Sequence, residues 1–242
     1  MSSPHTPLPS APLPAARTRI KVCGLTREQD VDAAVEAGAD AIGFVRYAQS
    51  PRHVSAARAA ELMRRLPPFV DAVLLYVNAD ATEIEADCAL STPGCLQFHG
   101  DESPAECARI ARACHLPWLR AARIPADPAA GFDLLEFAHD FSAATGILLD
   151  AQTQGYGGGG KTFDWSRLPP SVPAHLVLSG GLTPANVGDG LRALRSRGRS
   201  LAVDVSSGVE AVGPDGAPLK GIKDAARMRA FVAAVRAADL AA

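Results

Sequence analysis

The chain has 242 residues, of which 48% are hydrophobic, and this is enough apolar material for the core of one or two domains. Its net charge is −2, and the Arg residues are dispersed among Asp and Glu, so composition gives no support to nucleic-acid binding. No apolar run approaches the roughly 18 residues that a membrane-spanning helix needs. We therefore expect neither a nucleic acid nor a membrane as a partner.

The first 17 residues are rich in Pro and Ser and show no hydrophobic periodicity. They lack the basic region and the apolar stretch of a secretory signal. We expect residues 1–17 to be a disordered tail, residues 18–242 to form one catalytic domain, and the protein to be cytoplasmic. The five cysteines are odd in number and include no C-x-x-C pair, which predicts reduced thiols instead of a disulfide framework.

From Thr18 onward one pattern repeats: a short apolar run, a polar loop and an Ala-rich amphipathic stretch. Capping boxes at Thr26 and Ser103, and a Thr183-Pro184 pair, predict helix starts, and Gly38 predicts a helix end. The weakest helical pattern covers residues 127–140. The expected strands are Ile20–Cys23, Ala41–Val45, Ala72–Val77, Cys95–Phe98, Trp118–Ala121, Gly146–Leu149, Leu176–Leu178 and Leu201–Val205.

Eight strand-then-helix units with near-continuous apolar strands predict a parallel sheet covered by helices. Eight such units also close a ring, so we predict an α/β fold, a single-domain (β/α)8 TIM barrel. A doubly wound open sheet is the alternative, but no G-x-G-x-x-G follows the first strand. In a barrel the active site lies at the carboxyl ends of the strands, and this rule selects the candidate residues.

The first strand ends at Cys23, where a thiolate could act as a base or a nucleophile. A cysteine at a strand end is also commonly a small packed hydrophobic residue. Lys21 lies two residues earlier and shares the inward face. A lysine inside a barrel needs a carboxylate partner, and Asp204 on the eighth strand is the candidate.

The sixth strand leads to Asp150, which no helix follows directly, so it is not a helix cap. A carboxyl group in a mostly apolar barrel mouth has its charged form disfavoured, which suits it to donate a proton. The fourth strand ends near Gln97, which could orient a ligand by hydrogen bonding. His99 is either a general base or an exposed loop residue. Arg52, in the second loop, is either a fork for a carboxylate or a solvated surface residue.

Residues 155–162 match G-x-x-x-x-G-K-[ST], the nucleotide-binding P-loop. A P-loop, however, follows its strand directly and opens a full helix, whereas here four residues separate Asp150 from Gly155 and Pro169 stops any helix early. We expect a long mobile loop that contacts a phosphate, together with two small-residue turns after strands seven and eight. The expected phosphate-binding residues are Gly157, Gly158, Gly159, Gly160, Gly180, Gly181, Ser206, Ser207 and Gly208. No residue spacing is typical of a metal site, so we expect neither a metal nor another cofactor.

These segments, taken in order, resemble the phosphoribosylanthranilate isomerase family of tryptophan biosynthesis. The resemblance runs from about Arg19 to the C-terminal helix. It departs from the family at Gly159, where Ser is frequent, at Phe98, where Leu is common, and in the additional tail. The matching segments are Lys21–Thr26, Ser50–Arg52, Gln97–Gly100, Leu148–Asp150, Tyr156–Trp165, Leu178–Leu182 and Val203–Glu210.

The resemblance implies an isomerase that carries out an Amadori rearrangement of N-(5-phosphoribosyl)anthranilate to 1-(2-carboxyphenylamino)-1-deoxyribulose 5-phosphate. It implies Asp150 as general acid, Cys23 as general base and Arg52 as the ligand of the anthranilate carboxylate. We also expect Gln97, His99 and Asp204 to contact the substrate. The partner is then a small phosphosugar, while the sequence leaves the oligomeric state open.

Three alternatives remain at this stage. A related phosphosugar barrel such as an indole-glycerol-phosphate synthase would carry Lys and Glu where this chain has Cys23 and Asp150. A Schiff-base lyase would need a lysine in the mouth, but Lys21 is too deep and Lys161 lies in a loop. A non-catalytic phosphosugar-binding protein would keep the glycines and need neither Cys23 nor Asp150.

Overall fold

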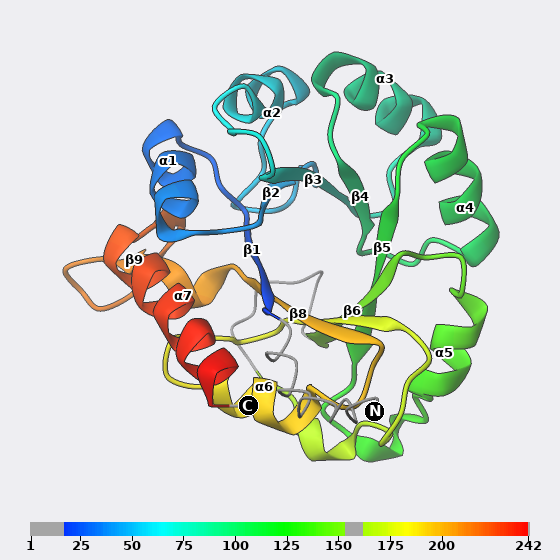
Figure 1. Ribbon diagram of the computed structural model, residues 1–242. Coiled ribbons are helices and arrows are strands. Elements are labelled where there is room, and N and C mark those ends of the chain that lie inside the picture. Colours follow the sequence, from blue (N-terminus) through cyan, green and yellow to red (C-terminus); the bar gives the residue numbers. More distant parts are fainter. Residues whose placement is uncertain (1–16, 153–161, 242) are drawn as a thin grey trace, which may run out of the picture.

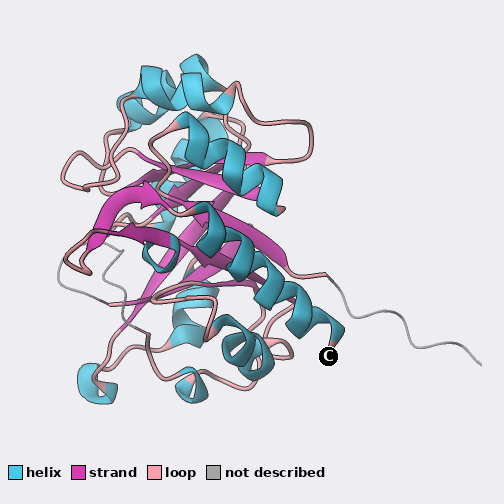
Figure 2. Ribbon diagram, turned by 90° about the vertical axis from the view of Figure 1, so that its left-hand side faces the viewer, coloured by secondary structure: helices cyan, strands magenta, loops and turns pink. Residues whose placement is uncertain are grey.

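The structure, a computed structural model, describes residues 17–152 and 162–241. Within these residues, eight parallel strands pair in chain order and the last pairs with the first, which closes a barrel and confirms the predicted fold. Figure 1 shows the helices surrounding the strands, and Figure 2 shows the strands crossing the molecule between helical layers. The strands are β1 (Arg19–Cys23), β2 (Ala41–Val45), β3 (Asp71–Tyr76), β4 (Cys95–Phe98), β5 (Trp118–Ile124), β6 (Gly146–Ala151), β7 (His175–Leu178) and β8 (Ser200–Val205).

In the described residues an α-helix follows every barrel strand except β6, after which only a short 3-10 helix forms. The helices are α1 (Glu28–Ala37), α2 (Ala56–Met63), α3 (Ala81–Ser91), α4 (Pro104–Ala113), α5 (Leu134–Asp140), α6 (Val187–Leu194) and α7 (Ala225–Leu240), with 3-10 turns η1 (Pro128–Ala130), η2 (Trp165–Arg167) and η3 (Ser207–Val209). Between β8 and α7 the chain adds a hairpin of β9 (Glu210–Val212) and β10 (Pro218–Lys223).

Several predicted helix boundaries are confirmed. The Ser103 side chain accepts a hydrogen bond from the backbone N–H of Glu106 at the start of α4, as its capping box predicts. Gly38 ends α1 in the left-handed region with φ +97°, which a residue with a Cβ adopts only at a cost. In the weakly helical stretch 127–140, one 3-10 turn precedes α5.

Two predicted helix starts are wrong. The Thr26 hydroxyl does not cap α1, because it donates to the carbonyl oxygen of Gly221 at 2.8 Å and so ties the first loop to β10. Thr183 does not cap α6, which begins later, at Val187. The side chain of Asn186 instead accepts from the backbone N–H of Thr183 at 2.8 Å and closes a turn ahead of the helix. In both places a tertiary or loop contact replaces the local cap.

Side chains alternate between two environments along each barrel strand. On β1, Ile20 and Val22 pack outward into the large apolar core shared with the helices, while Cys23 packs inside the barrel. Within the barrel, two small apolar clusters fill the lumen, and several buried polar residues share it. The clusters are Cys23, Val45, Leu75 and Val77, and Ala121, Leu148 and Val177; Lys21, Gln97 and Asp204 are among the buried polar residues. This alternation carries polar groups to the carboxyl ends of the strands.

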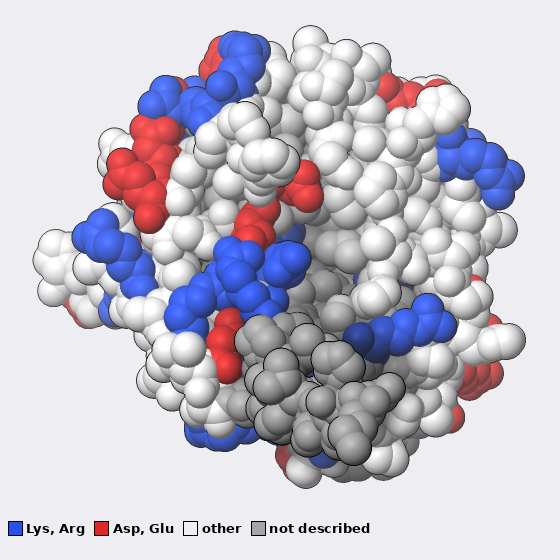
Figure 3. Space-filling view, in the orientation of Figure 1, with Lys and Arg blue, Asp and Glu red and all other residues white. Residues whose placement is uncertain are grey.

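Charge on the surface is mixed. On the face drawn in Figure 3, basic and acidic side chains lie beside one another. Several charged side chains of the protein surface form ion pairs, including Arg58 with Glu28 and Arg65 with Asp32. Among the described residues, no helix combines the length and the apolar character that crossing a membrane requires.

Candidate active site

Two groups of buried polar residues face each other at the carboxyl ends of the strands. We call Lys21, Cys23, Asp204 and Lys223 the thiol side; they come from β1, β8 and the end of β10. We call Gln97, His99 and Asp150 the carboxyl side; they come from β4, the loop that follows it, and β6. All seven residues are at most 5% exposed. Because the ring order is closed, β7 and β8 lie between β6, which carries Asp150, and β1, which carries Cys23.

On the thiol side, the Nζ atom of Lys21 donates to Oδ1 of Asp204 at 2.8 Å, which confirms the predicted partner of Lys21. The other oxygen of Asp204, Oδ2, accepts from the hydroxyl of Ser179 at 3.1 Å. A Cβ atom added to Gly43 would lie 2.6 Å from Sγ of Cys23 and 3.0 Å from Nζ of Lys21. The glycine on β2 therefore leaves room for a thiol and an ammonium group side by side.

Ammonium groups set the electrostatics of this side. Burial raises the pKa of the Cys23 thiol, and the positive charges of Lys21 and Lys223 oppose that shift. Burial alone would lower the pKa of Lys21, but the Asp204 carboxylate beside it holds that pKa above its usual value. For Lys223, burial lowers the pKa to about 8. Near neutral pH both lysines are mainly charged, and both favour the thiolate form of Cys23.

The other cysteines lack this setting. None of the five forms a disulfide. Burial raises the pKa values of Cys88, Cys95 and Cys107 to about 12, and it raises that of Cys23 as well. Cys23 is distinguished by its place at the carboxyl end of β1, where both Lys21 and Lys223 act on it, whereas Lys21 alone of the two acts on Cys95.

Arg52 is held by the hairpin that follows the barrel. Its Nε and Nη2 atoms donate to the two carboxylate oxygens of Glu210 at 2.7 and 2.9 Å, and both side chains are buried. Glu210 also accepts from the backbone N–H of Gly221 and from Nζ of Lys223. Burial would raise the pKa of Glu210, but Arg52 and Lys223 hold it below its usual value. Within residues 17–152 and 162–241, Nη1 of Arg52 makes no hydrogen bond, so one end of the guanidinium can still take a ligand.

The carboxyl side is a chain of three residues. Nε2 of Gln97 lies 3.0 Å from Nδ1 of His99, and Nε2 of His99 lies 3.0 Å from Oδ2 of Asp150. A Cβ atom added to Gly180 would lie 2.9 Å from Oδ1 of Asp150. One carboxyl oxygen therefore faces the histidine, and the other faces the turn after β7. His99 is thus part of a buried network and not a merely exposed loop residue.

The turns after β7 and β8 lie against each other. Gly180 and Gly181 have φ values of +76° and +62°, and within the described part of the chain their N–H groups donate no hydrogen bond. A Cβ atom on Gly208 would come within 1.8 Å of the carbonyl oxygen of Leu182, so only glycine permits this contact. Two of the predicted phosphate-binding turns, including Ser206 and Ser207, are brought together. The third predicted segment, residues 157–160, lies outside the described residues.

Sequence reasoning missed Arg123. The strand β5 was expected to end at Ala121 but continues to Ile124, and Arg123 pairs in register with Asp150 on β6. Its guanidinium forms an ion pair with Asp101, just after His99 in the chain. The arginine looked like the start of a loop because its charge interrupts the apolar run that marks a strand.

The hairpin residues were also missed as part of the site. Glu210 lies at the end of a segment that carries the family resemblance, and this was the one available signal for it. Lys223 has no such signal, because its place beside Ser206 depends on how the hairpin folds back: its Nζ donates to the carbonyl oxygen of Ser206 at 2.9 Å.

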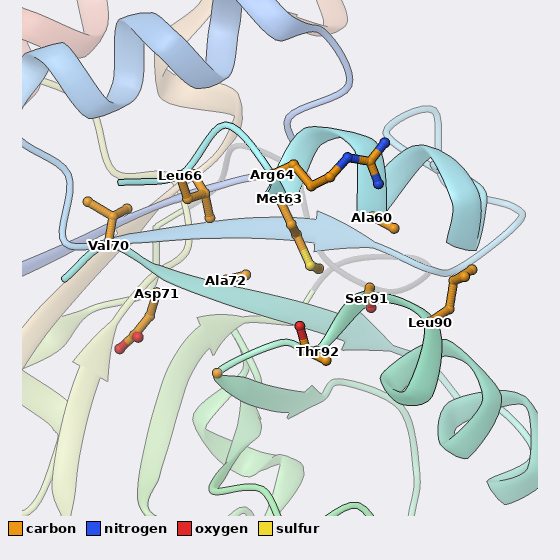
Figure 4. Close-up of a pocket in the computed structure, with 11 residues that line it drawn as sticks. Ala60, Met63, Arg64, Leu66, Val70, Asp71, Ala72, Leu90, Ser91 and Thr92 are labelled. Carbon is orange, nitrogen blue, oxygen red and sulfur yellow. The ribbon is translucent and has the colours of Figure 1, made fainter. Parts of the chain in front are cut away.

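A hollow of about 450 Å³ lies at the opposite end of the barrel. Figure 4 shows it between α2, α3 and the start of β3, with Met63, Leu66 and Leu90 among the side chains around it. In barrel enzymes the end where strands begin serves stability, and the carboxyl ends serve chemistry. The polar groups described above lie at the carboxyl ends, so we place the active site there.

The chain was compared with known proteins. The family model of N-(5'phosphoribosyl)anthranilate (PRA) isomerase matches residues 20–234. The chain belongs to this family. An N-(5'-phosphoribosyl)anthranilate isomerase of Dechloromonas aromatica is 57% identical over 92% of this chain and 98% of its own length. One of Methylibium petroleiphilum is 59% identical over 92% of this chain and 96% of its own length.

Solved structures of phosphoribosyl anthranilate isomerases agree. That of Thermotoga maritima superposes with a TM-score of 0.74 at 35% identity and covers 91% of this chain and 99% of that one. That of Thermus thermophilus gives a TM-score of 0.76 at 28% identity, with coverage of 91% and 99%. A third, at 32% identity and a TM-score of 0.71 with the same coverage, is in complex with reduced 1-(o-carboxyphenylamino)-1-deoxyribulose 5-phosphate. As a member of this isomerase family the chain is an enzyme, which excludes the alternative of a non-catalytic phosphosugar-binding protein.

Proposed function

We propose that this chain converts N-(5-phosphoribosyl)anthranilate into 1-(2-carboxyphenylamino)-1-deoxyribulose 5-phosphate in tryptophan biosynthesis. The observation that carries the proposal is the pairing of a thiol beside ammonium groups on β1 with a carboxyl beside an imidazole on β6. An aldose-to-ketose rearrangement needs one group to give a proton and another to take one. Family membership supplies the substrate class.

In the first step Asp150 is the general acid. It protonates the ribose ring oxygen while the nitrogen lone pair forms a C1=N bond, the C1–O bond breaks, and the furanose opens to a protonated Schiff base. The oxygen of Asp150 that faces Gly180 is the one that reaches the substrate, because the other oxygen is bonded to His99. This step leaves Asp150 as a carboxylate, which the hydrogen bond with His99 stabilises.

In the second step Cys23 is the general base. Its thiolate takes the proton from C2, and the C–H electron pair forms a C1=C2 bond as the C1=N electrons return to nitrogen, which gives an enolamine. The enolamine then tautomerises to the ketone at C2 with a CH2 group at C1. The positive iminium nitrogen acidifies the C2–H bond, so a modest base suffices, and neither a metal nor an organic cofactor takes part.

Binding groups surround these two residues. The N–H groups of Gly180 and Gly181, with Ser206, Ser207 and Gly208, form the phosphate site at the two turns between the acid and the base, and Gly157–Gly160 add to it. Arg52 offers Nη1 to the anthranilate carboxylate while Glu210 fixes its other end. Contacts from Gln97, His99 and Asp204 to the substrate itself stay predictions, since each already has a protein partner.

The test is direct. The purified full-length chain is incubated with N-(5-phosphoribosyl)anthranilate, and loss of the substrate's fluorescence is followed over time, with the Cys23→Ala/Asp150→Asn double variant as control. We expect rapid loss with the wild type and only the spontaneous rate with the double variant. Binding of the substrate without turnover by the wild type would contradict the proposal and would favour a phosphosugar-binding role.

A further inference from the structure

Gln97 is a fully buried polar residue in the lumen of the barrel. It lies on β4 in register with Leu75 on β3 and Leu119 on β5, so its strand neighbours are apolar. Its Oε1 atom has no hydrogen-bond partner within the described residues. A buried, unpaired amide oxygen costs stability, which calls for a reason that the amide is there.

The reason lies in the direction of the hydrogen bonds. Once Asp150 has given up its proton it can only accept, so the proton between it and His99 must then sit on Nε2 of the imidazole. A neutral imidazole then has an unprotonated Nδ1, which needs a donor. The NH2 group of Gln97, 3.0 Å from that atom, is such a donor. Both hydrogen bonds therefore run in the same direction: Gln97 donates to His99, and His99 donates to Asp150.

We propose that Gln97 is a positioning residue that keeps the proton of His99 on Nε2, so that His99 donates a hydrogen bond to Asp150 and does not take the proton from it. This inference rests on the proposed role of Asp150 as general acid. In this role Gln97 acts on Asp150 only through His99.

The reverse arrangement is disfavoured by the same geometry. If His99 took the proton of Asp150, it would become an imidazolium, and its Nδ1–H would point at the N–H of Gln97. The amide would have to turn over so that Oε1 accepted, which would leave both N–H bonds of its NH2 group in the place where Oε1 now lies without a partner. Buried donors without partners are rarer than buried carbonyl oxygens without partners. The transferable proton consequently stays on the carboxyl, at the oxygen that faces Gly180.

The loop that carries His99 is fixed independently. The Glu102 carboxylate accepts from the backbone N–H groups of Asn78 and Gly100, and from the guanidinium of Arg120 at 2.8 Å. Arg120 also donates to the carbonyl oxygens of Phe98 and Gly100 on either side of His99. The backbone on both sides of His99 is thus held by Glu102 and Arg120. Gln97 and Asp150 are left to set the orientation and the tautomer of the imidazole.

The experiment measures the tautomer and the rate separately. Long-range proton–nitrogen NMR spectra on histidine-labelled protein, at neutral pH, report which ring nitrogen of His99 carries the proton; the His99→Asn spectrum assigns the signal. Steady-state kinetics are measured for Gln97→Glu, whose carboxylate requires a proton on Nδ1 of His99, and for Gln97→Met, whose side chain has no N–H to donate to Nδ1. They are also measured for Gln97→Glu in a His99→Asn background. Circular dichroism and thermal unfolding check each fold, and Gln97→Met provides the test if the buried carboxylate of Gln97→Glu prevents folding.

We expect the wild type to carry the proton on Nε2 and Gln97→Glu to carry it on Nδ1 or on both nitrogens. We expect Gln97→Glu to lower kcat by about 10- to 1,000-fold, less than loss of the acid itself, with KM little changed. In the His99→Asn background the same change should cause no further loss. A proton on Nδ1 in the wild type, unchanged kcat in both Gln97 variants, or an equal loss without His99 would each overturn the inference. The NMR result stands even if the wild type proves inactive, so the two proposals fail separately.

Discussion

The two sides of the mouth differ in the charge of the groups around their central residues, Cys23 and Asp150. On the thiol side, Lys21 and Lys223 place positive charge around Cys23, and carboxylates balance it. On the carboxyl side, Asp150 is hydrogen-bonded to His99, and the other ring nitrogen of His99 contacts the uncharged Gln97. Charge therefore surrounds the group that, in the proposed mechanism, must lose its proton before it acts as a base. An imidazole and an amide, in turn, lie behind Asp150, the group that in the proposed mechanism keeps its proton until it acts as an acid.

In the proposed mechanism, this difference would let one barrel run proton transfer in both directions at one pH. A nearby cation favours the thiolate form of a thiol. The two small-residue turns after β7 and β8 lie between the sides in the ring of strands. A phosphosugar anchored there would present its ring oxygen to one side and its C2–H to the other. The predictions that follow probe this comparison.

The largest effect is expected from removing either reacting group. Cys23→Ala and Asp150→Asn should each lower kcat by roughly 10²–10⁴-fold, the usual contribution of general acid–base catalysis, while substrate binding changes little. Steady-state assays and a binding measurement on each variant check this. If turnover of either variant stayed within about threefold of the wild type, that residue would have no place in the mechanism.

The next effect concerns Arg52, at the edge of the thiol side. Arg52→Lys should weaken use of the substrate by about 1.5–3 kcal/mol, typical of a hydrogen bond to a charged group, because lysine cannot hold Glu210 and a ligand carboxylate together. The control is a substrate analogue without the carboxylate, which wild type and variant should handle alike. An equal loss on that analogue would mean that Arg52 only supports the loop through Glu210.

A smaller effect on stability tests the charge of the thiol side. Below pH 8 Lys223 is charged in the folded and the unfolded chain; between its folded pKa of about 8 and the ordinary 10.5, only the unfolded chain keeps the proton. The free energy of unfolding should therefore rise with pH across this window, by on the order of 1–3 kcal/mol.

Denaturant unfolding of the wild type and of Lys223→Met across that pH window measures this contribution. The wild type should gain stability relative to the variant as the pH rises. A constant difference between the two proteins would show that burial does not depress the pKa of Lys223.

The mildest effect is competition at the turns between the two sides. Inorganic phosphate or sulfate should raise the apparent KM without lowering kcat, because the N–H groups of Gly180 and Gly181 are open to an anion. Initial rates at several phosphate concentrations measure this, and activity should survive exhaustive chelation of metals. Magnesium-dependent hydrolysis of ATP that is lost in Lys161→Ala would instead support the P-loop interpretation of residues 155–162.

The fold, and the strand ends at which the proposed reacting pair lies, were within reach of sequence because both depend on local patterns. Eight apolar runs at regular spacing predict eight strands, and strand ends select Cys23 and Asp150. The Lys21–Asp204 pair follows from alternation along β1 and from closure of the ring. Glycines predict the tight turns after β7 and β8 because their missing side chains allow backbones to approach.

The rest depends on contacts that no local pattern encodes. Lys223 reaches the mouth only because a hairpin folds back after β8, and Thr26 contacts that hairpin in place of capping its helix. Arg123 lies level with Asp150 because the register of β5 and β6 extends a strand past a charged residue. The link from Gln97 to Asp150 requires knowing that both side chains meet the same imidazole.

The most direct test of the two-sided account is a kinetic isotope effect with substrate deuterated at C2 of the ribose. Weakening the base in Cys23→Ser should make removal of the C2 proton limit the rate, and a large primary isotope effect on kcat should appear. Weakening the acid in Asp150→Asn should make ring opening limit the rate, and the isotope effect should vanish. Isotope effects of equal size in the two variants would contradict the assignment of separate steps to the thiol side and the carboxyl side.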